Sequence, residues 1–369
     1  HLIFVVKIKN NMRVCILGSN LTALTLAKAL VNQNIFVDVM SGSKNYKINR
    51  SRTIGISKSN YEFFNQKIIN IEKIIWKLKR IEIFTDNLKN EKVLNFETNQ
   101  DQLFSILKNH QLYEILNRSL SSNKFYKKIK LKKNFNKFDI YNLIVNTDSL
   151  NVFTKKYFNK KIVKSYKSLA YTTVIDHEKI TNDTAVQIFT KRGPLAFLPI
   201  SKNKTSIVYS IHNSRKNFKE NISELINQYN YKYKIKKINK VETFDLKSFT
   251  LRTYYHDNIL AFGDLLHRIH PLAGQGFNMT IRDINILIRI IKNKTNLGLS
   301  LDKSVNEQFE NELRHKNYIF LNGIDLIHEF FNFERKTRNI ILSKSVQFFG
   351  KNPLINKFLT KIADKGITY

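Results

Sequence analysis

The sequence predicts an α/β fold that combines a doubly wound parallel lobe, an antiparallel β lobe and a helical C-terminus. Three observations lead to this prediction. A strand–turn–helix–strand pattern opens at residue 13, short apolar runs at hairpin spacing fill 169–211, and the chain after about residue 302 has helical periodicity.

The first unit begins with the apolar strand Arg13–Leu17, and the turn 18–23 follows it immediately. Apolar residues then recur at helical spacing up to about residue 32, and a second strand is expected at 36–40. This order of elements is typical of the opening of a dinucleotide-binding fold.

The middle of the chain is harder to interpret. Within the lysine- and asparagine-rich stretch 60–135, the pattern predicts helical segments around 69–76 and 103–116. A strand is expected at 141–146, running into Thr147, Asp148 and Ser149. The four runs that suggest a separate antiparallel sheet are 169–175, 186–189, 194–200 and 205–211.

A further strand is expected at 258–262, ending in Gly263 and Asp264. After the loop 267–276, apolar residues at steps of three and four mark one face of a long helix; they are Phe277, Ile281, Ile284, Ile288 and Ile291. The expected domains are a discontinuous lobe from 12–60, 100–165 and 250–300, an antiparallel lobe at 166–249 with 61–99 packed near it, and a helical region at 301–369. Because Met12 directly precedes the first strand, residues 1–11 are expected to be an upstream, non-native extension.

Composition excludes several classes of protein. The single cysteine excludes an intrachain disulfide, a four-cysteine zinc site and an iron–sulfur cluster held by this chain alone. No apolar run reaches the ~18 residues of a membrane-spanning helix. The net charge of +33 indicates an anionic partner, either nucleic acid or a membrane surface, or else a codon-driven excess of lysine. Nucleic acid is the less favoured partner, because the chain has no RNA-binding or zinc-finger pattern.

Three strand ends carry the candidate site: residues 18–23, Asp148, and 263–276. In open α/β sheets, ligands bind outside the carboxyl ends of the strands, so these turns are expected to converge on one ligand. The first turn precedes a helix whose N-terminal amides suit a pyrophosphate. Asp264 offers a carboxylate for sugar or ribityl hydroxyls, and the small residues of the last loop would let a flat cofactor approach the backbone.

The last loop carries a family resemblance. Gly263-Asp264-Leu-Leu-His267, His270-Pro-Leu-Ala-Gly-Gln-Gly-Phe-Asn278 and Arg282-Asp283 resemble the flavin-binding signature of the ubiquinone-biosynthesis hydroxylases. These are aromatic-ring monooxygenases of the para-hydroxybenzoate hydroxylase superfamily. Segments 52–57, 193–199 and 309–314 resemble other parts of the same family in the same order, so the resemblance spans about 12–365.

The resemblance implies a Rossmann-like lobe that binds FAD. The cofactor-binding residues that it implies are Gly18, Asn20, Ala23, Ser41, Arg52, Asp148, Gly263, Asp264, Pro271, Gly274, Gly276, Phe277 and Asn278. The flavin ring would lie against Pro271, Leu272, Ala273, Gly274, Gln275 and Gly276. No acid–base residue is singled out. No metal site is expected, because no nearby carboxylate or cysteine completes a set with His267 and His270.

The implied function is hydroxylation of a polyprenylated phenol or benzoquinone precursor in ubiquinone biosynthesis. NAD(P)H or another reductant would reduce the FAD, which would deliver one atom of molecular oxygen as a flavin hydroperoxide. The implied location is cytoplasmic, peripheral at the inner face of the membrane, with other ubiquinone-biosynthesis proteins as possible partners. A basic amphipathic helix near the C-terminus is expected to dock on an anionic membrane, or else to pack on its own domain; its apolar residues are Leu354, Ile355, Phe358, Leu359 and Ile362.

The chain also departs from the family pattern. Asn20 replaces the second glycine of G-x-G-x-x-G/A, and Ser41 replaces the acidic residue expected after the second strand. Ser149 replaces the glycine of an Ala-Asp-Gly motif, and Val152 replaces a serine. These departures leave open the alternative of a degenerate, non-catalytic relative that serves as a scaffold or accessory protein.

Overall fold

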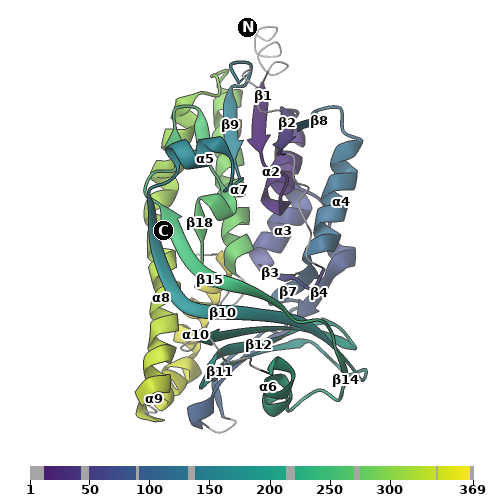
Figure 1. Cartoon of the computed structure of the whole chain (residues 1–369), viewed down its shortest axis with the longest axis vertical. Coiled ribbons are helices and arrows are strands. Elements are labelled where there is room, and N and C mark those ends of the chain that lie inside the picture. The colour runs from purple at the N-terminus through teal and green to yellow at the C-terminus, as the bar shows by residue number, and fades with distance from the viewer. Residues whose placement is uncertain are drawn as a thin grey trace.

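The computed structural model describes residues 12–42, 50–88, 91–131, 138–212, 221–269, 275–337 and 340–365, and arranges them around three sheets (Figure 1). Two of these sheets are large, and helix α8 extends along one side of the molecule from the parallel sheet to the antiparallel one. The predicted α/β fold class is confirmed. The expected upstream extension, 1–11, lies outside the described residues.

The first sheet is parallel except at one edge. Its order is β16-β17-β9-β1-β2-β8, and β16 pairs antiparallel with β17. The bounds are β1 Arg13–Leu17, β2 Phe36–Ser41, β8 Tyr126–Lys130, β9 Leu143–Asn146, β16 Tyr255–His256 and β17 Ile259–Ala261. Residues of β1, β2 and β9 are buried almost throughout, as expected for parallel strands with helices on both faces.

Helices α2 Leu21–Val31, α4 Asn109–Ser121, α5 Val152–Tyr157 and α7 Gln275–Asn296 lie around this sheet, and α3 Lys58–Lys67 contacts α7 and strands β3 Thr53–Ser57 and β7 Phe104–Lys108 of the small third sheet. Helix α2 is apolar on nearly its whole circumference, and all of its residues except Lys28 are buried. It contacts β2, α4 and α7, so no side of it faces solvent widely.

The second sheet has nine strands and is mostly antiparallel, in the order β18-β15-β10-β13-β12-β11-β5-β6, with β14 paired to β10. The bounds are β5 Arg80–Thr85, β6 Lys92–Glu97, β10 Lys161–His177, β11 Thr184–Thr190, β12 Gly193–Ser201, β13 Lys204–His212, β14 Ile235–Ile238, β15 Glu242–Leu251 and β18 His267–Arg268. Helix α6, Ile222–Tyr229, packs an apolar core against one face of this sheet. Strand β10 runs without interruption across the expected domain boundary at 165/166.

The third sheet corrects two helix predictions. It contains β3 Thr53–Ser57, β7 Phe104–Lys108 and β4 Ile75–Leu78, in the order β3-β7-β4. The helix expected at 69–76 is only a short 3-10 turn, Glu72–Ile74, followed by β4. The helix expected at 103–116 begins at Asn109, because the residues before it pair with β3 and β4. Short apolar runs fit either structure, and here pairing with distant strands decides.

The C-terminal region is helical, as predicted, with α8 Lys303–Thr337, α9 Ile340–Lys351 and α10 Pro353–Lys365. Helix α9 covers β6, the edge strand of the large sheet. The Gln347 side chain of α9 donates to the Lys92 carbonyl at 2.9 Å, and the Asn356 side chain of α10 donates to the Asn95 carbonyl at 2.8 Å. These bonds satisfy edge carbonyls that would otherwise invite another strand. Within the described part of the chain, none of the helices is both long and apolar enough to cross a membrane.

Candidate cofactor site

Three neighbouring parallel strands end at one edge of the sheet. Strands β17, β9 and β1 are consecutive in the sheet, and Gly263, Thr147 and Gly18 directly follow them or lie one residue beyond. The structure therefore brings together the three turns that the sequence singled out. Ligands of such sheets bind in the crevice outside these strand ends.

Gly18 has a backbone conformation that requires glycine. Its φ is +116°, and a Cβ atom there would lie 2.4 Å from Oγ1 of Thr147. That hydroxyl is fixed in place because it donates to the Leu17 carbonyl at 2.9 Å. The turns after β1 and β9 are therefore in direct contact, and only glycine permits their approach.

Gly263 brings the turn after β17 against the start of α2, beside the turns after β1 and β9. Its φ is +62°, and a Cβ atom would lie 2.5 Å from Cγ2 of Thr22, in the first turn of α2. The end of β17 therefore packs on the helix whose N-terminus faces the site.

Asn20 is the N-cap of α2. Its Oδ1 accepts a hydrogen bond from the Ala23 amide at 2.9 Å, and its Nδ2 donates to the Thr147 carbonyl at 2.9 Å. In the family pattern a glycine at this position would leave no side chain near a pyrophosphate. The structure gives a more specific effect, because one amide that the helix terminus would offer to an anion is already satisfied. The preference of asparagine for N-cap positions is the signal in the sequence that could have indicated this role.

The carboxylates at the strand ends differ in their surroundings. Asp148 is half-buried and accepts a hydrogen bond from the Leu150 amide at 2.9 Å, as in an Asx turn. Asp264 is exposed, and its side chain has no hydrogen-bond partner among the described residues. Asp264 is therefore the carboxylate that can accept bonds from a ligand without losing an internal contact.

The end of β2 lacks a carboxylate. Ser41 is half-buried and lies opposite Lys130 of β8. Arg52 is exposed at the start of β3, where its carbonyl accepts the Asn109 amide at 3.0 Å. Neither residue supplies the acidic contact to a ribose that the family pattern expects.

The loop before α7 is only partly described. His270, Pro271, Leu272, Ala273 and Gly274 lie outside the described residues, so their predicted contacts with a flavin ring stay predictions. The helix itself begins at Gln275, and Gly276 and Phe277 are half-buried. Among the described residues outside its own stretch of helix, the atom nearest to a Cβ built on Gly276 would be Cγ1 of Ile269, at 3.9 Å.

Asn278 has an internal role. Its buried side chain donates to the Gly55 carbonyl at 3.1 Å and accepts from the Ser57 amide at 2.9 Å and the Asn60 side chain at 3.0 Å. The amide group thus fastens the first turn of α7 to the end of β3 and the start of α3. Asn278 therefore fixes the element that carries the site, and its expected contact with the cofactor stays a prediction.

A buried pair anchors the other end of the loop. Nε2 of His267, in β18, lies 2.6 Å from Oδ2 of Asp283 on α7, and both side chains are almost completely buried. The pair spans the undescribed loop, joining the residues before it to the helix after it. No third histidine, cysteine or carboxylate of the described residues joins them to form a metal-binding group.

Arg282, which is half-buried, is the neighbouring charge. It lies over the ring of Phe320, with 4.6 Å from the guanidinium carbon to the ring centroid, and its Nε donates to the Asn278 carbonyl at 3.3 Å. Burial lowers the pKa of the guanidinium to about 10, which leaves it charged at neutral pH.

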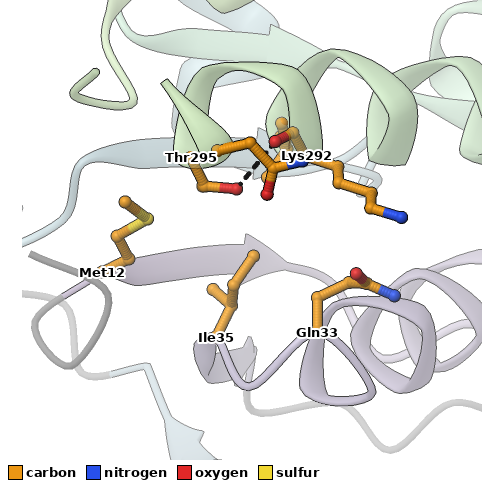
Figure 2. Close-up of a pocket in the computed structure, with 7 residues that line it drawn as sticks. Met12, Gln33, Ile35, Lys292 and Thr295 are labelled. Atoms are coloured by element: carbon orange, nitrogen blue, oxygen red, sulfur yellow. Dashed lines mark hydrogen bonds between the residues drawn. The ribbon is translucent and has the colours of Figure 1, made fainter. Parts of the chain in front are cut away.

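The small cavity shown in Figure 2 is not the cofactor site. It has a volume of about 70 Å³ and is lined by Met12, Gln33, Ile35, Lys292 and Thr295, among others. Met12 precedes β1, so the cavity lies at the amino end of the sheet, opposite the strand ends described above. Its volume is far below the ~300 Å³ at which ligand pockets begin.

Comparison with known proteins points to a flavin. Residues 142–296 match the family model of the FAD binding domain. The 3-demethoxyubiquinol 3-hydroxylase of Escherichia coli K12 is 29% identical over 162 residues, which cover 42% of this chain and 41% of that protein. The mitochondrial ubiquinone biosynthesis monooxygenase COQ6 of Schizosaccharomyces pombe is 22% identical over 273 residues, covering 61% of this chain and 57% of the relative.

Solved structures share the whole architecture. The p-nitrophenol 4-monooxygenase PnpA of Pseudomonas putida DLL-E4 superposes with a TM-score of 0.78 at 10% identity, over 97% of this chain and 100% of that one. In sequence, the chain spans only about two fifths to three fifths of the two curated relatives described above.

Proposed function

We propose that this chain, a divergent relative of the FAD-dependent hydroxylases of ubiquinone biosynthesis, is itself an FAD-dependent aromatic-ring monooxygenase. Its substrate would be a polyprenylated phenol or benzoquinone precursor of ubiquinone, and molecular oxygen would be the second substrate. The observation that carries the proposal is the meeting of Gly18, Thr147 and Gly263 at one edge of the parallel sheet, with the exposed carboxylate of Asp264 beside them.

The described residues fit FAD, and they fit it unequally along its length. At the pyrophosphate, Gly18 lets the turn after β1 pack directly on Thr147, and the first turn of α2 offers amides other than that of Ala23. At the ribityl chain, Asp264 would accept hydroxyl hydrogen bonds. At the adenosine ribose, Ser41 supplies no carboxylate. The adenosine end would therefore be held more weakly than the flavin end.

Bound FAD would supply the redox chemistry and the activation of oxygen, and the protein would supply position and exclusion of water. The His267–Asp283 pair joins the residues before the loop 270–274 to α7, and the contacts of Asn278 join the start of α7 to β3. The nine-stranded sheet would provide the substrate lobe. The reductant would be NAD(P)H or another donor.

The absorption spectrum of the purified protein tests cofactor binding. A yellow protein, or one that turns yellow when apoprotein is incubated with FAD and passed over a desalting column, is the expected result. Oxygen-dependent hydroxylation of a short-chain polyprenylphenol by the reduced, reconstituted protein would then test the activity.

A second candidate is a degenerate relative that acts as a scaffold or accessory protein of a ubiquinone-biosynthesis complex. The Asn20 cap favours this candidate, because the Asn20 side chain occupies the Ala23 amide, which a glycine at position 20 would leave free. A folded protein that stays colourless after incubation with FAD, yet is retained by other ubiquinone-biosynthesis proteins, would support this candidate.

The proposed substrate carries a lipid tail, so the protein would work at the inner face of the membrane as a peripheral, cytoplasmic protein. The net charge of +33 suits an anionic lipid surface. Failure to shift a DNA or RNA probe at physiological salt would remove nucleic acid as a rival partner.

A further inference from the structure

Helix α10 packs three of the five residues of its apolar face on its own chain, and Leu354 at its start remains exposed. Ile355, Leu359 and Ile362 are half-buried, and α10 contacts α3, β3 and α9. Its one carboxylate, Asp364, accepts the Ser59 amide at 2.8 Å in the first turn of α3. This helix therefore packs on its own chain, and the side chain of Phe358 lies outside the described residues.

Helix α9 has two different sides. One side faces the sheet: Ser343 is buried against Glu334, Gln347 bonds to Lys92, and Gly350 packs on Leu94 so tightly that a Cβ atom would lie 2.1 Å from Cδ2 of Leu94. This close contact fixes the rotation of α9 about its axis, and therefore decides which of its residues point away from the sheet.

The outward side combines large apolar residues with lysines. Ile341 is 73% exposed and Phe348 is 75% exposed, and Lys344 and Lys351 are exposed between and after them. The four residues follow at steps of three, four and three, which places them on one face of the helix. We call these four residues the α9 surface. Within the described part of the chain, neither lysine forms an ion pair.

We propose that the α9 surface binds an anionic lipid bilayer. Leu354, 78% exposed at the start of α10, and Phe349 extend the apolar area beside it. Residues 340–365 contain five lysines and one acidic residue, and that acid caps α3. Lysines set between apolar side chains on one helical face are typical of helices that lie in the membrane interface. The core of a protein–protein interface is instead depleted in lysine.

This inference rests on the proposed function, in which the substrate lies in a membrane. It adds the surface by which the protein would reach that membrane. Vesicle binding requires no flavin. The protein could therefore bind FAD and not vesicles, or bind vesicles and not FAD. The two proposals are therefore tested separately.

The experiment is sedimentation of the full chain with vesicles of phosphatidylcholine, with or without phosphatidylglycerol. Two variants remove the surface in different ways: Ile341→Ser with Phe348→Ser, and Lys344→Glu with Lys351→Glu. The matched controls change exposed residues elsewhere, Leu297→Ser with Leu299→Ser, and Lys202→Glu with Lys236→Glu. Circular dichroism and the thermal midpoint check that each variant is folded.

The wild type should bind the anionic vesicles and should bind pure phosphatidylcholine much less. The lysine variant should lower the partition constant by roughly tenfold or more, because each lysine near an anionic surface contributes about fivefold. The apolar variant should lose binding to both kinds of vesicle, and both controls should bind like the wild type.

Three results would overturn the proposal. The α9 variants, if folded, could bind as well as the wild type, or the controls could lose as much binding as they do. Third, the wild type could bind no vesicles and form a dimer in light scattering. If the variant Ile341→Ser with Phe348→Ser were then monomeric, a second copy of the chain would be the partner of this surface.

Discussion

Replacing Asn20 by glycine should change folding stability and cofactor affinity in opposite directions. The wild-type side chain makes two hydrogen bonds, one to the Ala23 amide and one to the Thr147 carbonyl. Removing the cap in favour of glycine costs a few tenths of a kcal/mol. Losing the bond to Thr147 costs about 1 kcal/mol. The free energy of unfolding of the apoprotein should therefore fall by about 1–1.5 kcal/mol.

The same change frees the Ala23 amide for a phosphate oxygen. A hydrogen bond to a charged group contributes about 1.5 kcal/mol or more, which corresponds to about tenfold in the Kd for FAD. Urea titration of the apoprotein measures the first quantity, and quenching of flavin fluorescence on titration measures the second.

The control is Asn221→Gly at the N-cap of α6, in the antiparallel lobe. It should lower stability slightly and leave the Kd unchanged. If Asn20→Gly weakens FAD binding, or leaves it as it is, the pyrophosphate does not lie at the N-terminus of α2 and the assignment of this turn is wrong.

Further substitutions test single contacts. Ser41→Glu should tighten FAD by about 1–2 kcal/mol in the same fluorescence titration by restoring a charge-assisted bond to the ribose; unchanged affinity would place the adenosine elsewhere. Asp264→Ala should abolish retention of flavin on a desalting column without altering the urea midpoint, since the side chain has no internal partner among the described residues. Asp283→Asn should cost about 3 kcal/mol or more in urea unfolding, because it breaks the buried pair with His267, and wild-type stability would show that the pair contributes nothing. Burial raises the pKa of Glu310 above its ordinary 4.5, so the folded protein holds that proton to higher pH than the unfolded chain does, and the contribution of Glu310 to stability falls as pH rises from 4.5 toward neutrality. The thermal midpoint of Glu310→Gln relative to the wild type should therefore rise over that range, and a constant difference would contradict this prediction.

The sequence predicted the parallel sheet well because its signals are local. Arg13–Leu17 is a short apolar strand, and α7 shows apolar residues at steps of three and four. The turns at Gly18 and Gly263 were predictable for the same reason, because glycine after a strand marks a special backbone conformation.

The remaining features depend on contacts between distant segments. Strand β4 pairs with β7, almost thirty residues away, and nothing within 75–78 distinguishes a strand from a helical turn. Asn278 bonds to Gly55 across more than two hundred residues. The sequence alone therefore could not show whether Asn278 contacts the cofactor or holds the fold together. The outward face of α9 was also unreadable, because only packing of Gly350 on β6 determines which side of an amphipathic helix is covered.

The stoichiometry of FAD binding tests the central claim most directly. Cys15 is the only cysteine and is fully buried in β1, where burial and the neighbouring Asp38 raise the pKa of its thiol. Thiol titration after denaturation therefore counts chains, and flavin absorbance counts cofactor in the same sample. The account predicts one FAD for each thiol after incubation and desalting, with the value falling toward zero in Asp264→Ala. A folded wild-type protein that retains no flavin, or a variant that retains as much as the wild type, would contradict it.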